Sequence, residues 1–182
     1  MRLFISINLD TVDELRAAQA PFEALSGIRT LDPEQVHFTL KFIGELDKQQ
    51  LPALQTALSE AVADAGVQPF DVAVGGYGAF PDHDYITVIW VGVRDGGHQF
   101  HRLHDAIERR TVDLGVEPAD HSFTPHATIA RMDHADEKAR VQTILEERDP
   151  DVGSIHVSTV ELMESRRTPS GSEYRTIHTV EL

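Results

Sequence analysis

His37-Phe38-Thr39-Leu40 and His126-Ala127-Thr128-Ile129 are two copies of one short pattern, and the expected fold is built around them. With 10 histidines and 13 threonines among 182 residues, about 0.7 His-x-Thr pairs are expected by chance, so one copy carries no weight. Both copies lie in strand-like segments, both have an aliphatic residue after the threonine, and they stand 89 residues apart in corresponding places. Together they indicate a duplicated site.

The two-residue spacing has a structural meaning in a β-strand. Residues i and i+2 point to the same face, about 6.6 Å apart, and the residues between them point to the other face. Each histidine therefore shares a face with its threonine. The apolar residues that alternate with them are expected to pack into a core and to hold the imidazole and the hydroxyl rigidly above it.

Two opposed imidazoles suit the hydrolysis of a cyclic phosphodiester, because water enters and an oxygen leaves on roughly opposite sides of the phosphorus. With ordinary pKa values near about 6.5, one histidine can accept the proton of the water while the other donates a proton to the departing ribose oxygen. Threonine hydroxyls between them can donate hydrogen bonds to the phosphoryl oxygens as charge builds. The residues alone leave a second interpretation open, which is two structural histidines beside threonines suited to strands.

Apolar periodicity predicts an α+β fold with mainly antiparallel sheets. Thr11 and Glu14 form a capping box at the start of a first helix, and no linker divides the chain. Residues 1–182 are therefore expected to form one domain, whose sequence halves make two lobes with one His-x-Thr motif each. The expected strands are 2–8, 36–43, 69–77, 85–93, 124–132, 154–163 and 173–181, and the expected helices lie near 15–25, 51–61, 100–114 and 135–148.

The formal net charge is −14, from 30 acidic and 16 basic residues, of which only 3 are lysine. Acid excess with scarce lysine is typical of proteins from a high-salt cytoplasm, where ions screen the self-repulsion; an ordinary acidic protein is the alternative. The charge argues against broad nonspecific binding of nucleic acid, which depends on many phosphate contacts. An RNA substrate would have to be bound locally.

Other classes are excluded by what the sequence lacks. It has no cysteine, which rules out disulfides and thiolate chemistry. No stretch approaches the roughly 18 apolar residues of a membrane span, and the apolar run 3–9 is too short for a signal sequence and predicts a first strand. We expect a monomeric cytoplasmic protein that does not associate with membranes.

Several further segments join the two motifs in a family resemblance that covers nearly the whole length. The chain resembles the two-histidine (2H) phosphoesterases, and among them the RNA 2',3'-cyclic phosphodiesterases historically called 2'-5' RNA ligases. The segments that carry it are Met1-Arg2-Leu3-Phe4-Ile5-Ser6-Ile7, Val36 to Glu45, Gly76-Tyr77-Gly78-Ala79-Phe80-Pro81, Trp90-Val91-Gly92-Val93, Phe123 to Arg131, Glu164-Ser165, Gly171 and Tyr174.

The resemblance implies a bilobal pseudo-twofold fold, with two mainly antiparallel sheets flanked by helices around a central cleft. It implies hydrolysis of 2',3'-cyclic phosphate ends of single-stranded RNA or tRNA to 2'-phosphates, with 2'-5' ligation as a side activity and with no metal or other cofactor. His37 would be the proton donor and His126 the acceptor, although the spacing does not decide between them. Thr39 and Thr128 would complete the catalytic set.

Four further residues are predicted to bind substrate. The resemblance favours Arg131 as a phosphate ligand, although its parity is opposite to that of His126, so it needs a bend, the end of the strand or its own length to reach the cleft. Lys41 shares the face of His37 if the strand stays regular. Tyr85 is a candidate for stacking a nucleobase and Arg166 for contacting phosphate. Relatives often carry Pro-Arg before the tryptophan strand, where this chain has Asp84-Tyr85-Ile86-Thr87, so a basic contact is missing there.

Three alternatives stay open. The chain could be a non-catalytic module that binds RNA ends, although both histidines and both threonines are present. It could act on a small cyclic nucleotide instead of RNA, which its acidity favours. His98, His101 and His104 raise a metal site on a helix, but their spacing spreads them around the helix, and a polar helix face is the better interpretation.

Overall fold

The computed structural model describes all 182 residues and confirms the α+β class. The strands are β1 (Arg2–Asn8), β2 (Ile28–Thr30), β3 (His37–Glu45), β4 (Phe70–Pro81), β5 (Ile86–Asp95), β6 (His126–Met132), β7 (Asp151–Val157), β8 (Thr159–Thr168) and β9 (Gly171–Glu181). The helices are α1 (Val12–Glu23), α2 (Leu51–Ala65), α3 (Gly97–Asp113) and α4 (Lys138–Glu147), with short 3-10 turns η1 (Pro33–Gln35) and η2 (Lys48–Gln50).

All nine strands belong to one hydrogen-bonded sheet in the order β7-β4-β5-β6-β3-β1-β8-β9, with β2 also paired to β6, and every pair is antiparallel. The two expected sheets are the two ends of this curled sheet. They are joined by β3 and β6, whose only ladder pair is Phe38 with Ala127. We call β3, β1, β8 and β9 the β3 half, and β7, β4, β5, β6 and β2 the β6 half.

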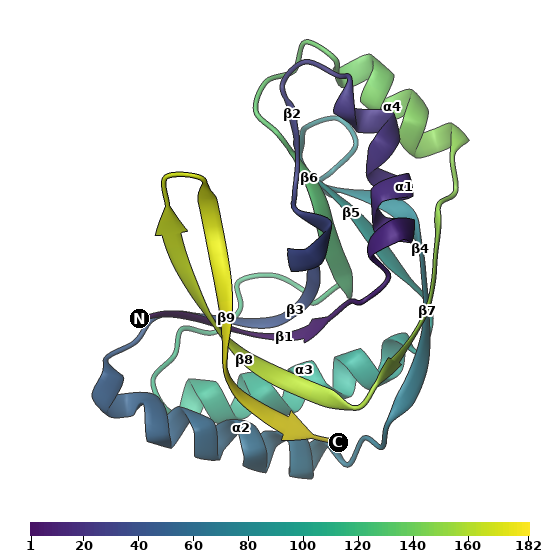
Figure 1. Ribbon diagram of the computed structural model, residues 1–182. Coiled ribbons are helices and arrows are strands. Elements are labelled where there is room, and N and C mark those ends of the chain that lie inside the picture. The colour runs from purple at the N-terminus through teal and green to yellow at the C-terminus, as the bar shows by residue number, and fades with distance from the viewer.

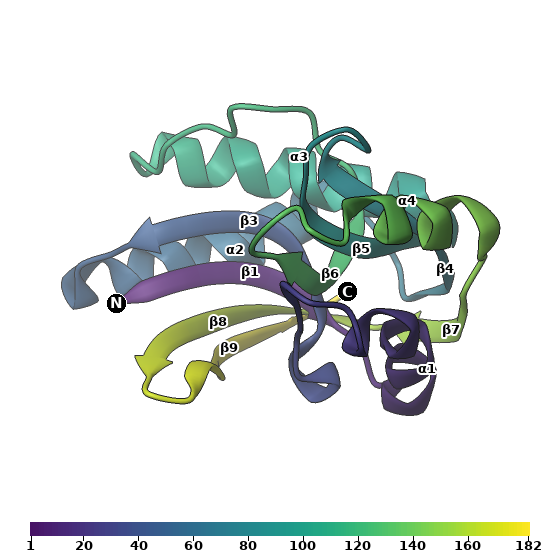
Figure 2. The same ribbon diagram turned by 90° about the horizontal axis from the view of Figure 1, so that it is seen from above.

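The helices cover the two halves separately. Helices α2 and α3 pack together, and α3 contacts β3, so this pair lies along the β3 half (Figure 1). Helix α1 contacts β2, β6 and β7 in the β6 half, and α4 lies at the same end of the molecule in both views (Figures 1 and 2). No helix combines the length and the apolar character that a membrane crossing requires.

The lobes are not the two halves of the sequence, which corrects the expectation from the duplicated motif. Strand β1 lies in the β3 half, whereas the helix that follows it, α1, packs in the β6 half. The predicted strand 154–163 is in fact two strands, β7 and β8, which lie in different halves and are separated by Ser158. The alternation of buried residues ends at Val157 and resumes out of phase at Val160, so the break at Ser158 and Thr159 is a signal of the crossing that the single predicted strand overlooked.

Three local expectations also need correction. Strand β2 was not predicted, because three residues are too few for a periodic signal. The expected strand 69–77 is longer than predicted, because β4 continues to Pro81 through several register shifts. Thr11 occupies the N-cap of α1, but its side chain makes no capping hydrogen bond and its hydroxyl is buried without a partner.

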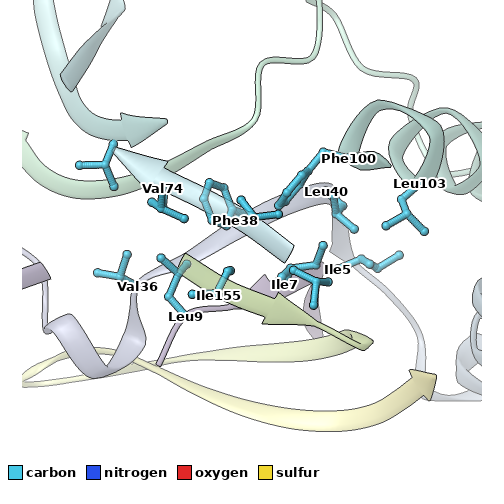
Figure 3. Packing of buried hydrophobic residues seen from close by; sticks show 14 of the residues in the cluster. Ile5, Ile7, Leu9, Val36, Phe38, Leu40, Val74, Phe100, Leu103 and Ile155 are labelled. Carbon is cyan, nitrogen blue, oxygen red and sulfur yellow. The ribbon is translucent and has the colours of Figure 1, made fainter. Parts of the chain in front are cut away.

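One hydrophobic core of 41 buried residues draws on both halves. Phe38 is fully buried and packs on Phe100 of α3, with ring centroids 4.9 Å apart, close to Leu40 and Leu103 (Figure 3). Ala127, the β6 partner of Phe38, is also fully buried. The apolar residue of each His-x-Thr motif therefore faces the core, as the two-residue spacing predicts.

Candidate functional site

The two His-x-Thr motifs meet where the two halves of the sheet join. Since β3 and β6 run antiparallel with Phe38 opposite Ala127, His37 comes opposite Thr128 and Thr39 opposite His126. Directly opposite residues of an antiparallel pair point to the same face, so all four side chains lie on the face away from the buried pair. In a regular pair, diagonal neighbours such as the two histidines are about 7–8 Å apart. The register brings together two motifs that are distant in the sequence.

Both imidazoles are oriented by the same backbone contact. Nδ1 of His37 lies 2.8 Å from the carbonyl oxygen of Gln35, and Nδ1 of His126 lies 2.7 Å from that of Thr124, so each ring bonds to the carbonyl two residues before it. A carbonyl oxygen only accepts, so Nδ1 must carry a hydrogen in both rings. In each histidine this leaves Nε2 as the nitrogen that can exchange a proton with a ligand.

Each histidine also has its own pair of aromatic neighbours. Phe4 stacks on His37 with ring centroids 4.7 Å apart, and Tyr174 meets the same imidazole edge-on at 5.3 Å. His126 contacts Phe80 edge-on at 4.7 Å and lies 5.9 Å from Trp90. The aromatic rings limit the lateral movement of the imidazoles, and the hydrogen bonds to the backbone carbonyls fix the orientation of each imidazole ring.

Burial lowers the pKa of both His37 and His126 below the ordinary value of 6.5, because a charged imidazole is poorly solvated there. The carbonyls of Gln35 and Thr124 act in the opposite direction, since they stabilise the protonated ring. The charge of His126 lowers the pKa of His37 further, and that of His121 does so for His126. Protonation of both histidines at once is therefore disfavoured.

The threonine hydroxyls face the same side and form no hydrogen bond within the protein. Thr39 pairs in register with Ser6 of β1, and Thr128 with Trp90 of β5, so both backbones are fixed by neighbouring strands. Both side chains are partly exposed. Their hydroxyl groups are free to donate to a ligand.

A β-bulge follows each motif at the same point. Ile5 of β1 pairs with Lys41 and Ser6 pairs with Thr39, so Leu40 is skipped. On β6, the neighbouring β5 residues pair with Ala130 and with Thr128, so Ile129 is skipped. An extra residue reverses the parity of everything beyond it. The residue five positions after each histidine, Phe42 or Arg131, is thereby brought back to the histidine face.

The bulge corrects the prediction for Lys41. Its side chain is buried against α3, where Nζ pairs with Glu108 at 2.7 Å and donates to the carbonyl oxygen of Glu117 at 2.7 Å. The pKa of Glu108 is lowered: burial of this carboxyl raises it, and the contacts with Lys41 and with the backbone N–H of Ala119 together outweigh that effect. Lys41 stabilises the packing of α3 on β3 and does not reach the substrate side.

A cleft of about 840 Å³ opens beside His37, between the β8–β9 hairpin and β2, which project from the two halves (Figure 1). Of the four motif residues only His37 lines it directly. Arg131 also lines the cleft, and the bulge at Ile129 is the bend that turns it there. The lining residues are 2–4, 29–32, 35, 37, 42, 44, 131, 165, 167, 168 and 170–174.

Two other predicted substrate contacts lie elsewhere. Arg166 forms an ion pair with Glu164 at 3.0 Å and does not line the cleft, because strand alternation gives that position to Arg167. Tyr85 lies in the turn between β4 and β5, where Asp82 accepts a hydrogen bond from its backbone N–H. The ring of Tyr85 is 69% exposed and lines neither of the two main cavities.

A second cavity, of about 520 Å³, adjoins His126 through Trp90, Thr124 and Pro125. His98 and His101 of α3 line its other side. The third helix histidine, His104, is buried, bonds to the carbonyl of Leu40 at 2.7 Å and stacks on Phe123. No group of three or more His, Asp or Glu side chains is arranged to hold a metal ion.

Sequence reasoning did not identify the contacts of Phe4, Tyr174, Phe80 and Trp90 with the histidines. Tyr174 lies on β9, far from His37 in the sequence, and only the sheet order brings the two together. A usable signal for Trp90 was present in the glycines: a Cβ at Gly78 would lie 2.1 Å from the indole ring. A glycine at this place in a strand indicates that a large group approaches the backbone.

Comparison with known proteins agrees with this geometry. The family model described as the 2'-5' RNA ligase superfamily matches residues 7–169. An RNA 2',3'-cyclic phosphodiesterase of Aeropyrum pernix is 34% identical over 154 residues, which cover 84% of this chain and 85% of that protein. Another, of Archaeoglobus fulgidus, is 29% identical over 185 residues and covers 100% of both chains.

Solved structures show the same fold. A crystal structure of a Thermus thermophilus protein superposes with a TM-score of 0.82 at 25% identity, covering 100% of this chain and 98% of that one. Escherichia coli LigT complexed with 3'-AMP gives a TM-score of 0.81 at 20% identity, over 100% and 97% of the two chains. These likenesses confirm the predicted 2H phosphoesterase fold.

Proposed function

Since this chain belongs to the 2'-5' RNA ligase superfamily, we propose that it hydrolyses 2',3'-cyclic phosphate ends of RNA and leaves 2'-phosphates. The observation that carries the proposal is the antiparallel pairing of the two His-x-Thr motifs at Phe38 and Ala127. Its relatives from Aeropyrum pernix and Archaeoglobus fulgidus are RNA 2',3'-cyclic phosphodiesterases, which supports the same reaction.

In the proposed reaction the two histidines move protons at opposite ends of the reacting phosphate. Nε2 of neutral His126 accepts a proton as the water oxygen bonds to phosphorus. The bond from phosphorus to the ribose 3' oxygen breaks, and Nε2–H of protonated His37 donates its proton to that oxygen. The product carries a 2'-phosphate and a free 3' hydroxyl, and one proton has moved from His37 to His126 in net terms.

Other groups on the same face stabilise the charge that develops. The hydroxyls of Thr39 and Thr128 donate hydrogen bonds to the non-bridging phosphoryl oxygens. The guanidinium of Arg131, turned to this face by the bulge, binds phosphate with charge-assisted hydrogen bonds. The orientation of both imidazoles by backbone carbonyls supports these roles, because proton transfer depends on the position of Nε2.

If the 5' hydroxyl of a second strand takes the place of water, its proton goes to His126, its oxygen bonds to phosphorus and the bond from phosphorus to the 3' oxygen breaks, with His37 protonating that oxygen. This step leaves a 2'-5' linkage, so ligation of RNA is proposed as a side activity. The substrate proposed is a single-stranded RNA or tRNA end, bound by a protein that acts as a monomer in the cytoplasm. A small cyclic nucleotide as the sole substrate is the second candidate, and the excess of acidic residues favours it because acidic surfaces repel RNA.

The test is hydrolysis of a short RNA with a 2',3'-cyclic phosphate end, with the product compared with 2'- and 3'-phosphate standards by chromatography. We expect only the 2'-phosphate, and His37→Ala and His126→Ala should each lower kcat about 100-fold or more. His156→Ala is the matched control, because this exposed histidine pairs with Asp71 far from the motifs.

Each outcome discriminates between the candidates. A 3'-phosphate product, or a near-normal rate in either motif variant, would contradict the mechanism. Tight binding of the RNA end without turnover would identify a binding module. Turnover of a free 2',3'-cyclic nucleotide but of no RNA would favour the small-molecule candidate.

A further inference from the structure

Phe42 is the most exposed large hydrophobic side chain, with 70% of its surface accessible. A single exposed apolar residue needs no explanation by itself. The position of Phe42 does need an explanation, because this exposed side chain lines the cleft beside His37. The bulge at Leu40 buries Lys41 and turns Phe42 to the side on which the proposed chemistry takes place.

Phe42 extends an aromatic surface that begins at the candidate catalytic centre. The β1 residue directly opposite it is Phe4, whose ring stacks on the imidazole of His37. Side chains of directly opposite residues share a face, with Cβ atoms about 4.5–5.5 Å apart. Phe4 is 4% exposed, so Phe42 is the ring of this row that is open to a ligand.

The same cleft concentrates unpaired positive charge. Arg2, Arg131 and Arg167 line it, and none of them forms an ion pair. Asp32 and Glu173 are the acids of the cleft, and Asp32 already accepts the capping hydrogen bond of η1. No lysine or arginine lines the second cavity. A chain with a net charge of −14 thus presents three unpaired guanidinium groups in one groove, beside Arg29, which pairs with Asp133, and this suits an anionic ligand.

An open aromatic ring beside unpaired guanidinium groups is the arrangement that binds single-stranded nucleic acid, because bases stack and phosphates pair with the cations. We propose that Phe42 stacks on the base of the nucleotide next to the one that carries the cyclic phosphate. Phe42 therefore makes the enzyme selective for an RNA strand over a free cyclic mononucleotide. This inference rests on the proposed function.

The distance along β3 determines which base is in reach. Phe42 follows His37 by five residues, which is roughly 15 Å of strand. The reacting ribose must lie against Nε2 of the histidines, so its own base is held close to them. A ring farther along the cleft is available to the neighbouring base. Because every base has a π face, the contact is expected to tolerate any sequence.

The experiment compares kcat/KM for a trinucleotide ending in a 2',3'-cyclic phosphate with kcat/KM for 2',3'-cyclic AMP. Phe42→Ala should lower the value for the trinucleotide about tenfold, as loss of one stacked base does, and should leave cyclic AMP within twofold. Phe42→Trp should retain the preference for the strand. Tyr85→Ala is the matched control, because it removes an equally exposed ring outside the cleft and should change neither value.

A parallel binding measurement separates this inference from the proposed function. Fluorescence anisotropy with a labelled trinucleotide ending in a 2'-phosphate should give a Kd about tenfold weaker for Phe42→Ala. If the wild-type protein turns over neither substrate, the proposed function is overturned. The binding measurement would still decide whether Phe42 stacks on the RNA. Equal binding by wild type and Phe42→Ala, or equal loss on both substrates, would overturn the stacking role.

Discussion

The strand that carries His37 and the strand that carries His126 are built alike at the backbone and differ in what they present five residues further on. In both, Nδ1 bonds to the carbonyl two residues earlier, and in both a bulge follows the motif. Beyond the bulge the β3 half presents Phe42 and the β6 half presents Arg131. The shared backbone orients two imidazoles, to which we assign proton transfer, whereas the proposed roles of Phe42 and Arg131 concern different parts of one nucleotide chain.

The residues just before Phe42 and Arg131 show a second difference between the halves. In the β3 half it is Lys41, which is buried and needs Glu108 of α3 as its partner. In the β6 half it is Ala130, which is fully buried and needs none. The bulge therefore places this position in the core in both halves. A lysine is tolerated in the β3 half because Glu108 of α3 packs against it.

The strongest test of equivalence between the halves replaces the two threonines. Thr39→Val and Thr128→Val keep the shape but remove a hydrogen-bond donor, and each is expected to lower kcat about 100-fold. Thr179→Val, an exposed strand position on β9, should leave kcat unchanged. A loss confined to one threonine would show that only one half stabilises the phosphoryl oxygens, and no loss in either would remove both from the site.

Replacing arginines tests the difference between the halves. Arg131→Ala should raise KM for the RNA end about tenfold, as loss of a charge-assisted hydrogen bond of about 1.5 kcal/mol predicts, and the effect should shrink as salt is added. Arg166→Ala is the control, because this guanidinium is engaged by Glu164 off the cleft. Steady-state kinetics at two ionic strengths measure both, and an equal effect of the two variants would contradict the assignment.

A smaller effect is expected from the packing that supports His126 alone. In Gly78→Ala the new Cβ would lie 2.1 Å from the ring of Trp90, which must then move away from its place beside the imidazole. We expect a loss of about 1–3 kcal/mol in the free energy of unfolding and a few-fold loss of kcat. Gly97→Ala has no atom within 4 Å of the new Cβ and should leave kcat unchanged. Urea unfolding and steady-state kinetics measure both variants. If the two have the same stability and the same kcat, the packing of Trp90 against Gly78 does not support His126.

The smallest effect is a shift along the pH axis. Burial lowers the pKa of both histidines, and the mechanism needs one neutral and one protonated ring, so kcat/KM should peak below pH 6.5. The unfolded chain binds protons more readily at these positions, so the free energy of unfolding is fully retained above pH 6.5 and falls as pH drops toward the folded pKa values. A kcat/KM optimum well above pH 7 would contradict this account.

The sequence predicted the site better than the architecture. The two-residue spacing sufficed to predict that each histidine shares a face with its threonine and that Phe38 and Ala127 are buried. A bulge leaves no local composition signal, so Lys41 was expected on the wrong face, and for Arg131 a bend could be required but not located. The crossing at Ser158 was missed although the alternation breaks there, at two successive residues that are not buried, Ser158 and Thr159.

The aromatic neighbours of the histidines show the same limit. The contact of Tyr174 with His37 depends on β8 and β9 joining the edge of β1, which is a property of the whole sheet. Arg166 and Arg167 are adjacent residues of the same type, and only the register of β8 shows that Arg167 lines the cleft. Long-range strand order and register are thus what the sequence left undetermined.

The central claim is that His37 and His126 act on one phosphate in the same chemical step. It is tested most directly by single-turnover hydrolysis of the RNA end by wild type, His37→Ala, His126→Ala and the double variant. Groups that act as a unit are strongly non-additive, so the double variant should be about as slow as the slower single variant. Losses that multiply in the double variant would mean that the two histidines act independently, and would contradict the account.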